Sequence, residues 1–212
     1  MYIPPSNAEP SAPAVHDFID VHPLGVLVTA SADGLFATHL PLLLHRDRGA
    51  HGTLAGHVAR ANPHHRQVPS IAEALVIFSG PQAYITPTWY AAKEEHGKVV
   101  PTWNYIAVHV YGSLRFTDDP VFLRKHLEQL VSRHEAGRPV SWGIGDAPER
   151  YIEQQVKAIV GLELTITRLE GKWKMSQNRS DADIDGVVRG LQQSTADNDR
   201  VVAGIVEARR PR

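Results

Sequence analysis

The stretch "IAVHVYGSLRF", residues 106–116, carries the clearest structural pattern in the chain. One set of alternate positions is apolar: Ile106, Val108, Val110, Leu114 and Phe116. The positions between them include His109, Tyr111, Ser113 and Arg115. Such alternation is typical of a half-buried β-strand, because successive side chains point to opposite faces. We therefore predict a strand with one face in the core and a polar opposite face.

Upstream, two strand-like runs predict a hairpin. Residues 24–30 and 35–44 are joined by a turn that contains Asp33 and Gly34. Pro41 in the second run indicates an edge strand or a bulge, since proline has no N–H for a ladder. Residues 74–80 and 82–86 predict a further strand pair around Gly80-Pro81.

Helical patterns separate these strands. Residues 14–22 predict a short opening helix, and residues 59–68 are helix-like, with Pro63 as a cap or kink. Residues 118–135 predict a helix with Asp at its start and Pro120 in its first turn. Residues 146–160 predict another helix, which opens with a capping-box pattern of Asp146 and Glu149 and stops at Gly161.

The last third of the chain predicts a strand and two weak helices. Residues 162–170 alternate as a strand, with a turn expected at Gly171, and weak helices follow at 181–193 and 198–210. Strands with hairpin-length turns and late helices favour an α+β fold, a small β-barrel with added helices. We expect one domain over residues 1–190, with a polar helix or tail over residues 191–212.

Composition limits the classes of function. The 212 residues carry a net charge of -1, which argues against an extensive DNA footprint, because phosphate contacts dominate such binding. With no cysteine, a thiolate nucleophile or Cys-based zinc site is excluded. No run approaches the roughly 20 apolar residues of a membrane helix. The polar start "MYIPPSNAEPSAP" does not resemble a signal peptide, so we expect a cytoplasmic protein.

Donors for an anion gather in "GKWKMSQNRS", residues 171–180. Lys172, Lys174 and Arg179 surround Ser176, Gln177 and Asn178 directly after a strand-like run. Two lysines, an arginine and three polar side chains suit a phosphate group. The alternative is a solvated surface turn.

Aromatic and hydroxyl side chains gather in residues 84–105. Two Thr-Trp pairs, at Trp89 and Trp103, suggest the rim of a pocket for a planar ligand. Alternatively, both tryptophans are anchors of the core or of a dimer interface.

A third cluster, residues 56–66, holds His57, His64 and His65 beside two arginines. Neutral imidazoles there would suit a metal or haem iron, or the cluster would bind an anion. Histidines that are merely exposed or hydrogen-bonded are the alternative.

Five motifs together resemble the PaiB family: "MYIP" at 1–4, "GHVARANP" at 56–63, "GPQAYITPTWY" at 80–90, "HGKVVPTWNY" at 96–105 and "AIVGLELTITRLEGKWKMSQNR" at 158–179. That family is described as FMN-binding negative transcriptional regulators related to pyridoxamine-phosphate-oxidase-like split barrels. The resemblance implies a split β-barrel homodimer with peripheral helices, a helical C-terminus and a flavin phosphate at the subunit interface. The residues that it implies for FMN binding are Thr86, Trp89, Tyr90, Lys98, Thr102, Trp103, Asn104, Lys174, Ser176, Gln177 and Arg179.

One departure from the family pattern concerns the histidines. The family's "ANP" is usually followed by an apolar residue or Gln and then Trp, whereas this chain has His64 and His65. Piperazate synthases, a more distant haem-dependent branch, place their proposed axial histidine directly after the same "NP". Haem with His64 as its axial ligand is therefore the alternative cofactor.

Three functions remain open from the sequence. The first is an FMN-binding regulator that represses transcription as a homodimer, with DNA contact only weakly supported by the charge. The second is an enzyme on the same barrel, either a flavin oxidoreductase or a haem protein, for which no catalytic residue can be named. The third is a barrel that binds no cofactor and acts through its dimer surface.

Overall fold

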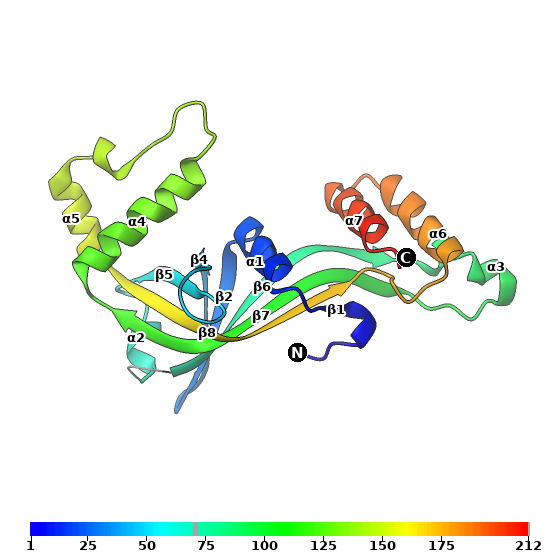
Figure 1. The fold of residues 1–212 in the computed structure, drawn as a ribbon, viewed down its shortest axis with the longest axis horizontal. Helices are drawn as coiled ribbons and strands as arrows, with labels where there is room; N and C mark the ends of the chain where they lie inside the picture. The colour runs from blue at the N-terminus through cyan, green and yellow to red at the C-terminus, as the bar shows by residue number, and fades with distance from the viewer. Residues whose placement is uncertain (70–71, 212) are drawn as a thin grey trace. The chain divides into compact units, whose positions relative to one another are not determined.

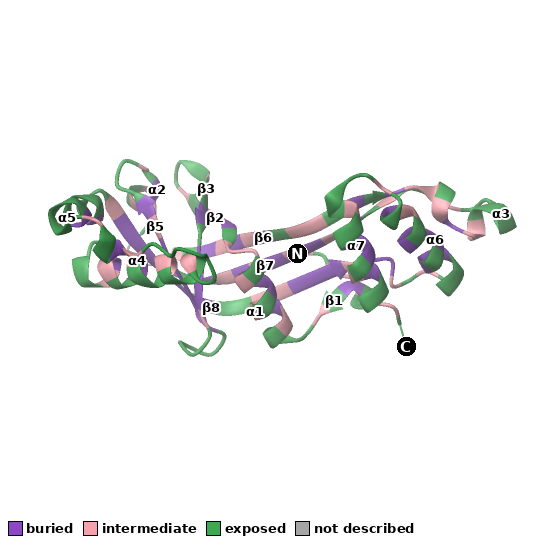
Figure 2. Cartoon of the chain, turned by 90° about the horizontal axis from the view of Figure 1, so that it is seen from above, coloured by how far each residue is buried: buried purple, intermediate pink, exposed green. Residues whose placement is uncertain are grey.

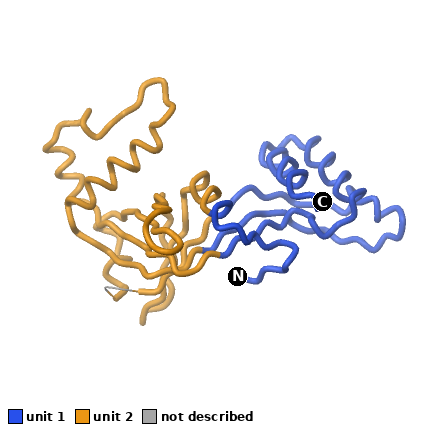
Figure 3. Tube along the Cα trace, in the orientation of Figure 1, with its two compact units in different colours: residues 1–15, 79–109, 170–212 blue, residues 16–78, 110–169 orange. Residues whose placement is uncertain are grey.

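A computed structural model describes residues 1–69 and 72–211. Two compact units are each built from segments that are distant in sequence (Figure 3). Unit 1 comprises residues 1–15, 79–109 and 170–212, and unit 2 comprises residues 16–78 and 110–169. Three long strands contribute residues to both units: β6 (Ala72–Ile85), β7 (Thr102–Thr117) and β8 (Ile159–Lys174).

Unit 2 contains the curled sheet. Its other strands are β2 (Leu24–Ser31), β3 (Gly34–Pro41), β4 (Leu43–His45) and β5 (Thr53–Ala59). The strand order is β3-β2-β6-β7-β8-β5-β4, and β3 also contacts β5. Apolar side chains of this sheet, among them Leu27, Leu54 and Leu164, are fully buried, and Figure 2 shows the buried stretches along the strands.

The predicted hairpin and the central strand are confirmed. β2 and β3 pair antiparallel from Leu24–Pro41 to Ser31–Gly34, and β3 stands at one end of the strand order, as Pro41 indicated. β7 extends the predicted strand at both ends. Along it, Ile106, Val108 and Val110 are buried, while the residues between them are more exposed.

Two predicted turns are wrong, because β6 and β8 continue through them. At Gly80-Pro81, the ladder between β2 and β6 covers only Leu75 to Ile77, so Pro81 lies beyond it and its missing N–H removes no bond of that ladder. At Gly171, a side chain would collide with the core instead: a Cβ would lie 2.6 Å from Trp173 and 2.9 Å from Val15. Glycine serves close packing there, not a turn.

The helices largely follow the sequence. The opening helix is α1 (Ala12–Val21). α4 (Pro120–Glu135) begins as predicted, because the Asp119 carboxylate accepts a hydrogen bond from the Val121 N–H at 2.9 Å. α4 packs on α5 (Glu149–Lys157) around a buried cluster of Leu123, Ile144, Ile152 and Val156.

Two helix boundaries differ from the prediction. The helix expected over residues 59–68 is shorter in the structure: α2 (His64–Gln67) begins after Pro63. Ala59 is instead the last residue of β5. The capping box expected for residues 146–160 is wrong. Asp146 instead accepts from the Gly143 N–H at 2.7 Å and closes the 3₁₀ turn η3 (Ile144–Asp146). α5 starts after Pro148 and stops at Lys157, while Gly161 lies in β8.

Unit 1 contains the two predicted terminal helices. α6 (Asp181–Gln192) and α7 (Asp197–Ala208) contact each other and appear orange and red in Figure 1. Arg212, in the predicted tail, lies outside the described residues. The short elements of this unit are η1 (Pro5–Asn7), β1 (Ala8–Glu9), which pairs with β8, η2 (Pro87–Trp89) and α3 (Ala92–His96).

The predicted fold class is confirmed: the chain is α+β, a split β-barrel with peripheral helices and a helical C-terminus. Over the described ranges, none of the helices combines the length and the apolar character that a membrane crossing requires.

Candidate functional site

Lys174, the last residue of β8, connects the donor-rich stretch of residues 171–180 to the start of β7. Its ammonium group contacts the Thr102 hydroxyl and donates a hydrogen bond to the Trp103 carbonyl oxygen at 2.5 Å. Two segments that the sequence separates by about seventy residues are thereby brought together. Both belong to the predicted FMN-binding set.

Asn104 and Ser176 form a second link between these segments. The Asn104 amide donates to the Ser176 hydroxyl at 3.0 Å, and both side chains are buried. Ser176 has a φ of 63°, in the left-handed region that non-glycine residues rarely adopt. Such a conformation carries a conformational cost and is found preferentially at ligand-binding sites.

Arg179 and Tyr90 form the third link. The Arg179 guanidinium lies 4.5 Å from the centre of the Tyr90 ring, a cation–π arrangement. Tyr90 is buried, and burial raises the pKa of its phenol despite the neighbouring arginine. Its hydroxyl oxygen makes no hydrogen bond of good geometry within the described part of the chain.

The electrostatics of this cluster are those of uncompensated cations. Burial first, and then the charges of Lys172 and Arg179, lower the pKa of Lys174. Lys172 is buried and donates to the Tyr2 carbonyl at 3.2 Å, with its ammonium 5.1 Å from the centre of the Tyr105 ring. Within residues 1–69 and 72–211, no carboxylate lies within ion-pair distance of these three cations. We call Lys172, Lys174 and Arg179 the cation cluster.

The other predicted residues have different surroundings. The Thr86 hydroxyl caps η2 by accepting from the Thr88 N–H at 3.3 Å, and Lys98 is exposed. Gln177 binds its own loop, accepting from the Met175 N–H at 2.7 Å. Trp89 packs on α6, where Cβ atoms added at Gly186 and Gly190 would lie 1.8 Å and 2.2 Å from it. Trp89 therefore packs on α6, and its side chain is only partly buried.

Trp103 differs from Trp89, because its ring is exposed. About half of its side chain is accessible (51%), and it meets the equally exposed Tyr84 edge to face, with ring centres 6.1 Å apart. This exposed aromatic pair stands where β6 ends and β7 begins.

His64 is completely buried in unit 2, and both of its ring nitrogens are engaged. Nε2 lies 2.8 Å from the Thr29 hydroxyl and Nδ1 lies 2.8 Å from the Thr38 hydroxyl. The His64 N–H also donates to the Asn62 side chain at 3.0 Å. Burial lowers the pKa of the ring, so it is neutral at pH 7. In this arrangement neither nitrogen is open to an iron atom, and the residue does not fit an axial haem ligand.

The structure reveals two further contacts, of whose residues the sequence analysis had singled out only His57. Asp183, buried in the first turn of α6, accepts from the Ala92 N–H at 3.0 Å and so fastens residues 84–105, which we call the aromatic loop. In unit 2, His57 Nδ1 lies 3.1 Å from His126 Nε2, across 69 positions of sequence. An acid in a helix's first turn is a capping signal, but no local pattern marks a pair as distant as the two histidines.

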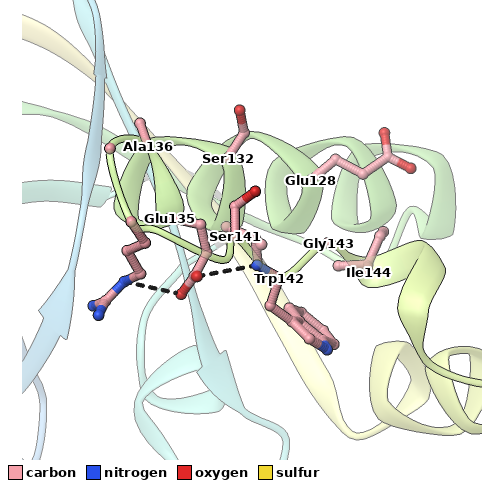
Figure 4. A pocket seen from close by; sticks show the side chains of 11 residues that line it. Glu128, Ser132, Glu135, Ala136, Ser141, Trp142, Gly143 and Ile144 are labelled. Carbon is pink, nitrogen blue, oxygen red and sulfur yellow. Dashed lines mark hydrogen bonds and ion pairs between the residues drawn. The ribbon is translucent and has the colours of Figure 1, made fainter.

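A cavity of about 470 Å³ lies outside the predicted residues, between α4 and the loop that follows it (Figure 4). Its Glu135 carboxylate accepts from the Trp142 N–H at 3.1 Å and pairs with Arg138 at 3.4 Å. Its other acidic group, Glu128, pairs with Arg124 at 3.3 Å, so both carboxylates are already engaged. In the described ranges, no three His, Asp or Glu side chains are grouped so as to hold a metal ion.

The family model described as "Putative FMN-binding domain" matches residues 1–168. The chain belongs to this family. A relative in Bacillus subtilis, "Protease synthase and sporulation protein PAI 2", is 32% identical over 209 residues, with 98% of this chain and 97% of that protein covered. The resemblance to the PaiB family is thereby confirmed. The cation cluster lies beyond the 168 residues of the family model but within the range of this relative.

Other comparisons agree. "Uncharacterized protein AN0679" of Emericella nidulans is 34% identical over 247 residues, with 99% of this chain and 97% of that protein covered. Among solved structures, the FAD and haem binding protein from Mycobacterium smegmatis has a TM-score of 0.57 at 17% identity, covering 84% of this chain and 79% of that one. The flavocytochrome Anf3 from Azotobacter vinelandii has a TM-score of 0.56 at 15% identity, covering 78% and 68%. At such identities these two structures support the fold alone.

Proposed function

We propose that the chain is an FMN-binding regulator of the PaiB type and that Lys174 and Arg179 hold the flavin phosphate. The observation that carries the proposal is the cation cluster, whose charges have no acidic partner in the described residues. A phosphate ester carries nearly two negative charges and several acceptor oxygens, which match one ammonium and one guanidinium group.

The donor set fits this group chemically. Burial and the neighbouring cations lower the pKa of Lys174, so a nearby anion would restore the stability of its charged form. Two further features would be explained by a ligand: the left-handed conformation of Ser176, and the buried Tyr90 hydroxyl, which makes no hydrogen bond of good geometry in the described residues. Lys174 and Arg179 would bind and orient the phosphate, and the pairing of Asn104 with Ser176 would hold their loop.

A bound flavin supplies reversible electron and hydride transfer, so an oxidoreductase on this barrel needs no strong catalytic side chain of its own. Haem is the weaker alternative, because His64 is fully engaged by Thr29 and Thr38. The two cofactors are separated by absorption spectra of the purified protein after incubation with FMN or with haemin. We expect a flavin band that remains with the protein on gel filtration. A sharp Soret band that His64→Ala abolishes would replace this proposal with the haem reading.

We propose that the protein acts as a homodimer through a surface that includes Trp103 and Tyr84. Both aromatic side chains are about half exposed, and such residues are enriched at interfaces. Sedimentation velocity of the wild type is expected to give a dimer, and Trp103→Ala is expected to shift it toward monomer. A wild-type monomer across the micromolar range would contradict this part.

Repression is the regulatory role that we propose, exerted directly on DNA or through a partner. Because the net charge is only -1, we expect direct DNA affinity to be weak and to fall steeply with salt. Fluorescence anisotropy with a labelled duplex at several salt concentrations measures this. Tight, sequence-selective binding at physiological salt would contradict the expectation.

A further inference from the structure

A second polar cavity, of about 400 Å³, lies in unit 2 between α4 and the strands β4, β5 and β8. Its volume falls within the range of small-molecule pockets, about 300–1,000 Å³. The buried residues that line it are Ala55, His126 and Glu163. None of its lining residues belongs to the predicted flavin site, so its role is independent of the proposed function.

One ring nitrogen of His126 makes no hydrogen bond in the described residues. Its Nε2 is engaged with His57 Nδ1 at 3.1 Å, but its Nδ1 is buried and has no partner among the described residues. Burial first, and then the neighbouring His57 and His45, lower its pKa to about 4, so the ring is neutral at pH 7. A buried polar atom without a hydrogen bond is destabilising, and a ligand or a water molecule that bonded to it would offset this cost.

Cationic and carboxylate side chains line the cavity in equal numbers. Glu163 is held by Arg48 at 2.5 Å and Arg115 at 2.8 Å, and these arginines outweigh its burial and lower its pKa. Lys125 and Asp47 also line the cavity and form no ion pair in the described ranges. The charges of the lining residues therefore balance, and Arg115, which does not line the cavity, adds one positive charge beside Glu163.

An apolar surface completes the cavity. Phe122 lines it beside Ala55, and its ring stacks with that of His126, with centres 6.0 Å apart. A ligand that uses these groups needs an anionic end and an apolar body. In the cavity of Figure 4, by contrast, the Glu135 carboxylate already accepts from the Trp142 N–H and pairs with Arg138.

We propose that this cavity binds a small organic carboxylate. The carboxylate accepts a hydrogen bond from His126 Nδ1 and pairs with Lys125, and its apolar body packs on Phe122. A carboxylate only accepts hydrogen bonds, so His126 must carry its proton on Nδ1. His57 must then donate its own Nδ1–H to His126 Nε2, which assigns the tautomer of both rings.

Benzoate and inorganic phosphate are the probes, added to the full chain with ¹⁵N-labelled histidine and followed by NMR. We expect benzoate to bind saturably with millimolar Kd, and Lys125→Ala to raise the Kd at least fivefold. Lys157→Ala is the matched control, because it removes the same charge from an exposed position outside the cavity. It is expected to leave the Kd unchanged.

Three results would overturn the proposal. The first is shifts that do not saturate, as expected for a cavity that holds only water. The second is phosphate binding as tight as that of benzoate, which would remove the role of the apolar surface. The third is a histidine spectrum in which the His126 ring carries its proton on Nε2 while benzoate is bound.

Discussion

Single residues define the two features on which the account depends, the cation cluster and the buried His64. Alternation along a strand puts Lys172 and Lys174 on one face and Trp173 and Met175 on the other. The structure confirms that Trp173 and Met175 are buried, but Lys172 is buried too, beneath the Tyr2 backbone. Alternation therefore accounts for the burial of Trp173 and Met175, whereas the burial of Lys172 depends on the N-terminal segment, which no local pattern indicates.

His64→Ala is expected to lower the free energy of unfolding by about 2–4 kcal/mol, because it leaves the buried Thr29 hydroxyl without its partner and opens a cavity. Urea denaturation measures the loss. His65→Ala is the matched control, since His65 is only partly buried and makes one hydrogen bond, from Nδ1 to the Asn62 carbonyl at 2.8 Å. We expect it to cost about 1 kcal/mol or less. Equal losses in the two variants would contradict the structural role of His64.

At the scale of elements, the alternation of the strands, the Asp119 cap and the hairpin turn before Gly34 were predicted correctly. The Asp146 capping box and the turns at Gly80-Pro81 and Gly171 were not. The alternation of β7 and the Asp119 cap of α4 follow from local chemistry. Gly80, Pro81 and Gly171 are residue types typical of turns, yet they lie inside continuous strands. Packing against residues that are distant in sequence or on the same strand face decides their conformation, not the local sequence. The contact of Lys174 with Thr102 joins distant segments and has no local signature.

The packing of α6 on η2 depends on glycine. In Gly186→Ala, the new Cβ would lie 1.8 Å from the Trp89 carbonyl oxygen, so the helix must move away from the aromatic loop. We expect the melting temperature to fall by several degrees, corresponding to a loss of about 2 kcal/mol or more.

Gly204→Ala in α7 provides the control. Its Cβ would meet no atom within 4 Å, and alanine is the better helix former by about 1 kcal/mol. This variant should therefore be as stable as the wild type or more stable. Equal melting temperatures for Gly186→Ala and Gly204→Ala would contradict the close contact between α6 and Trp89.

At the scale of the whole molecule, the buried histidines make stability depend on pH. An unfolded chain protonates His126 near its ordinary pKa of 6.5, whereas the folded chain does so only at about 4. The stability that the neutral ring contributes is therefore complete above pH 6.5 and is lost as the pH falls toward 4. The expected loss from this residue is about 3 kcal/mol.

Urea denaturation of the wild type and His126→Leu across this pH range isolates the effect, because all other groups titrate in both proteins. We expect the wild type to lose stability more steeply than His126→Leu between pH 6.5 and 4. Parallel curves would show that His126 protonates equally well in the folded chain.

The most direct test of the central claim is the affinity for FMN compared with that for riboflavin, which differ by the phosphate. Flavin fluorescence quenching measures both Kd values for the wild type and for Lys174→Ala/Arg179→Ala. We predict that the double substitution weakens FMN at least tenfold, about 1.4 kcal/mol or more, and changes riboflavin by less than twofold. An equal loss for the two ligands, or none for FMN, would contradict the assignment of the cation cluster to the flavin phosphate.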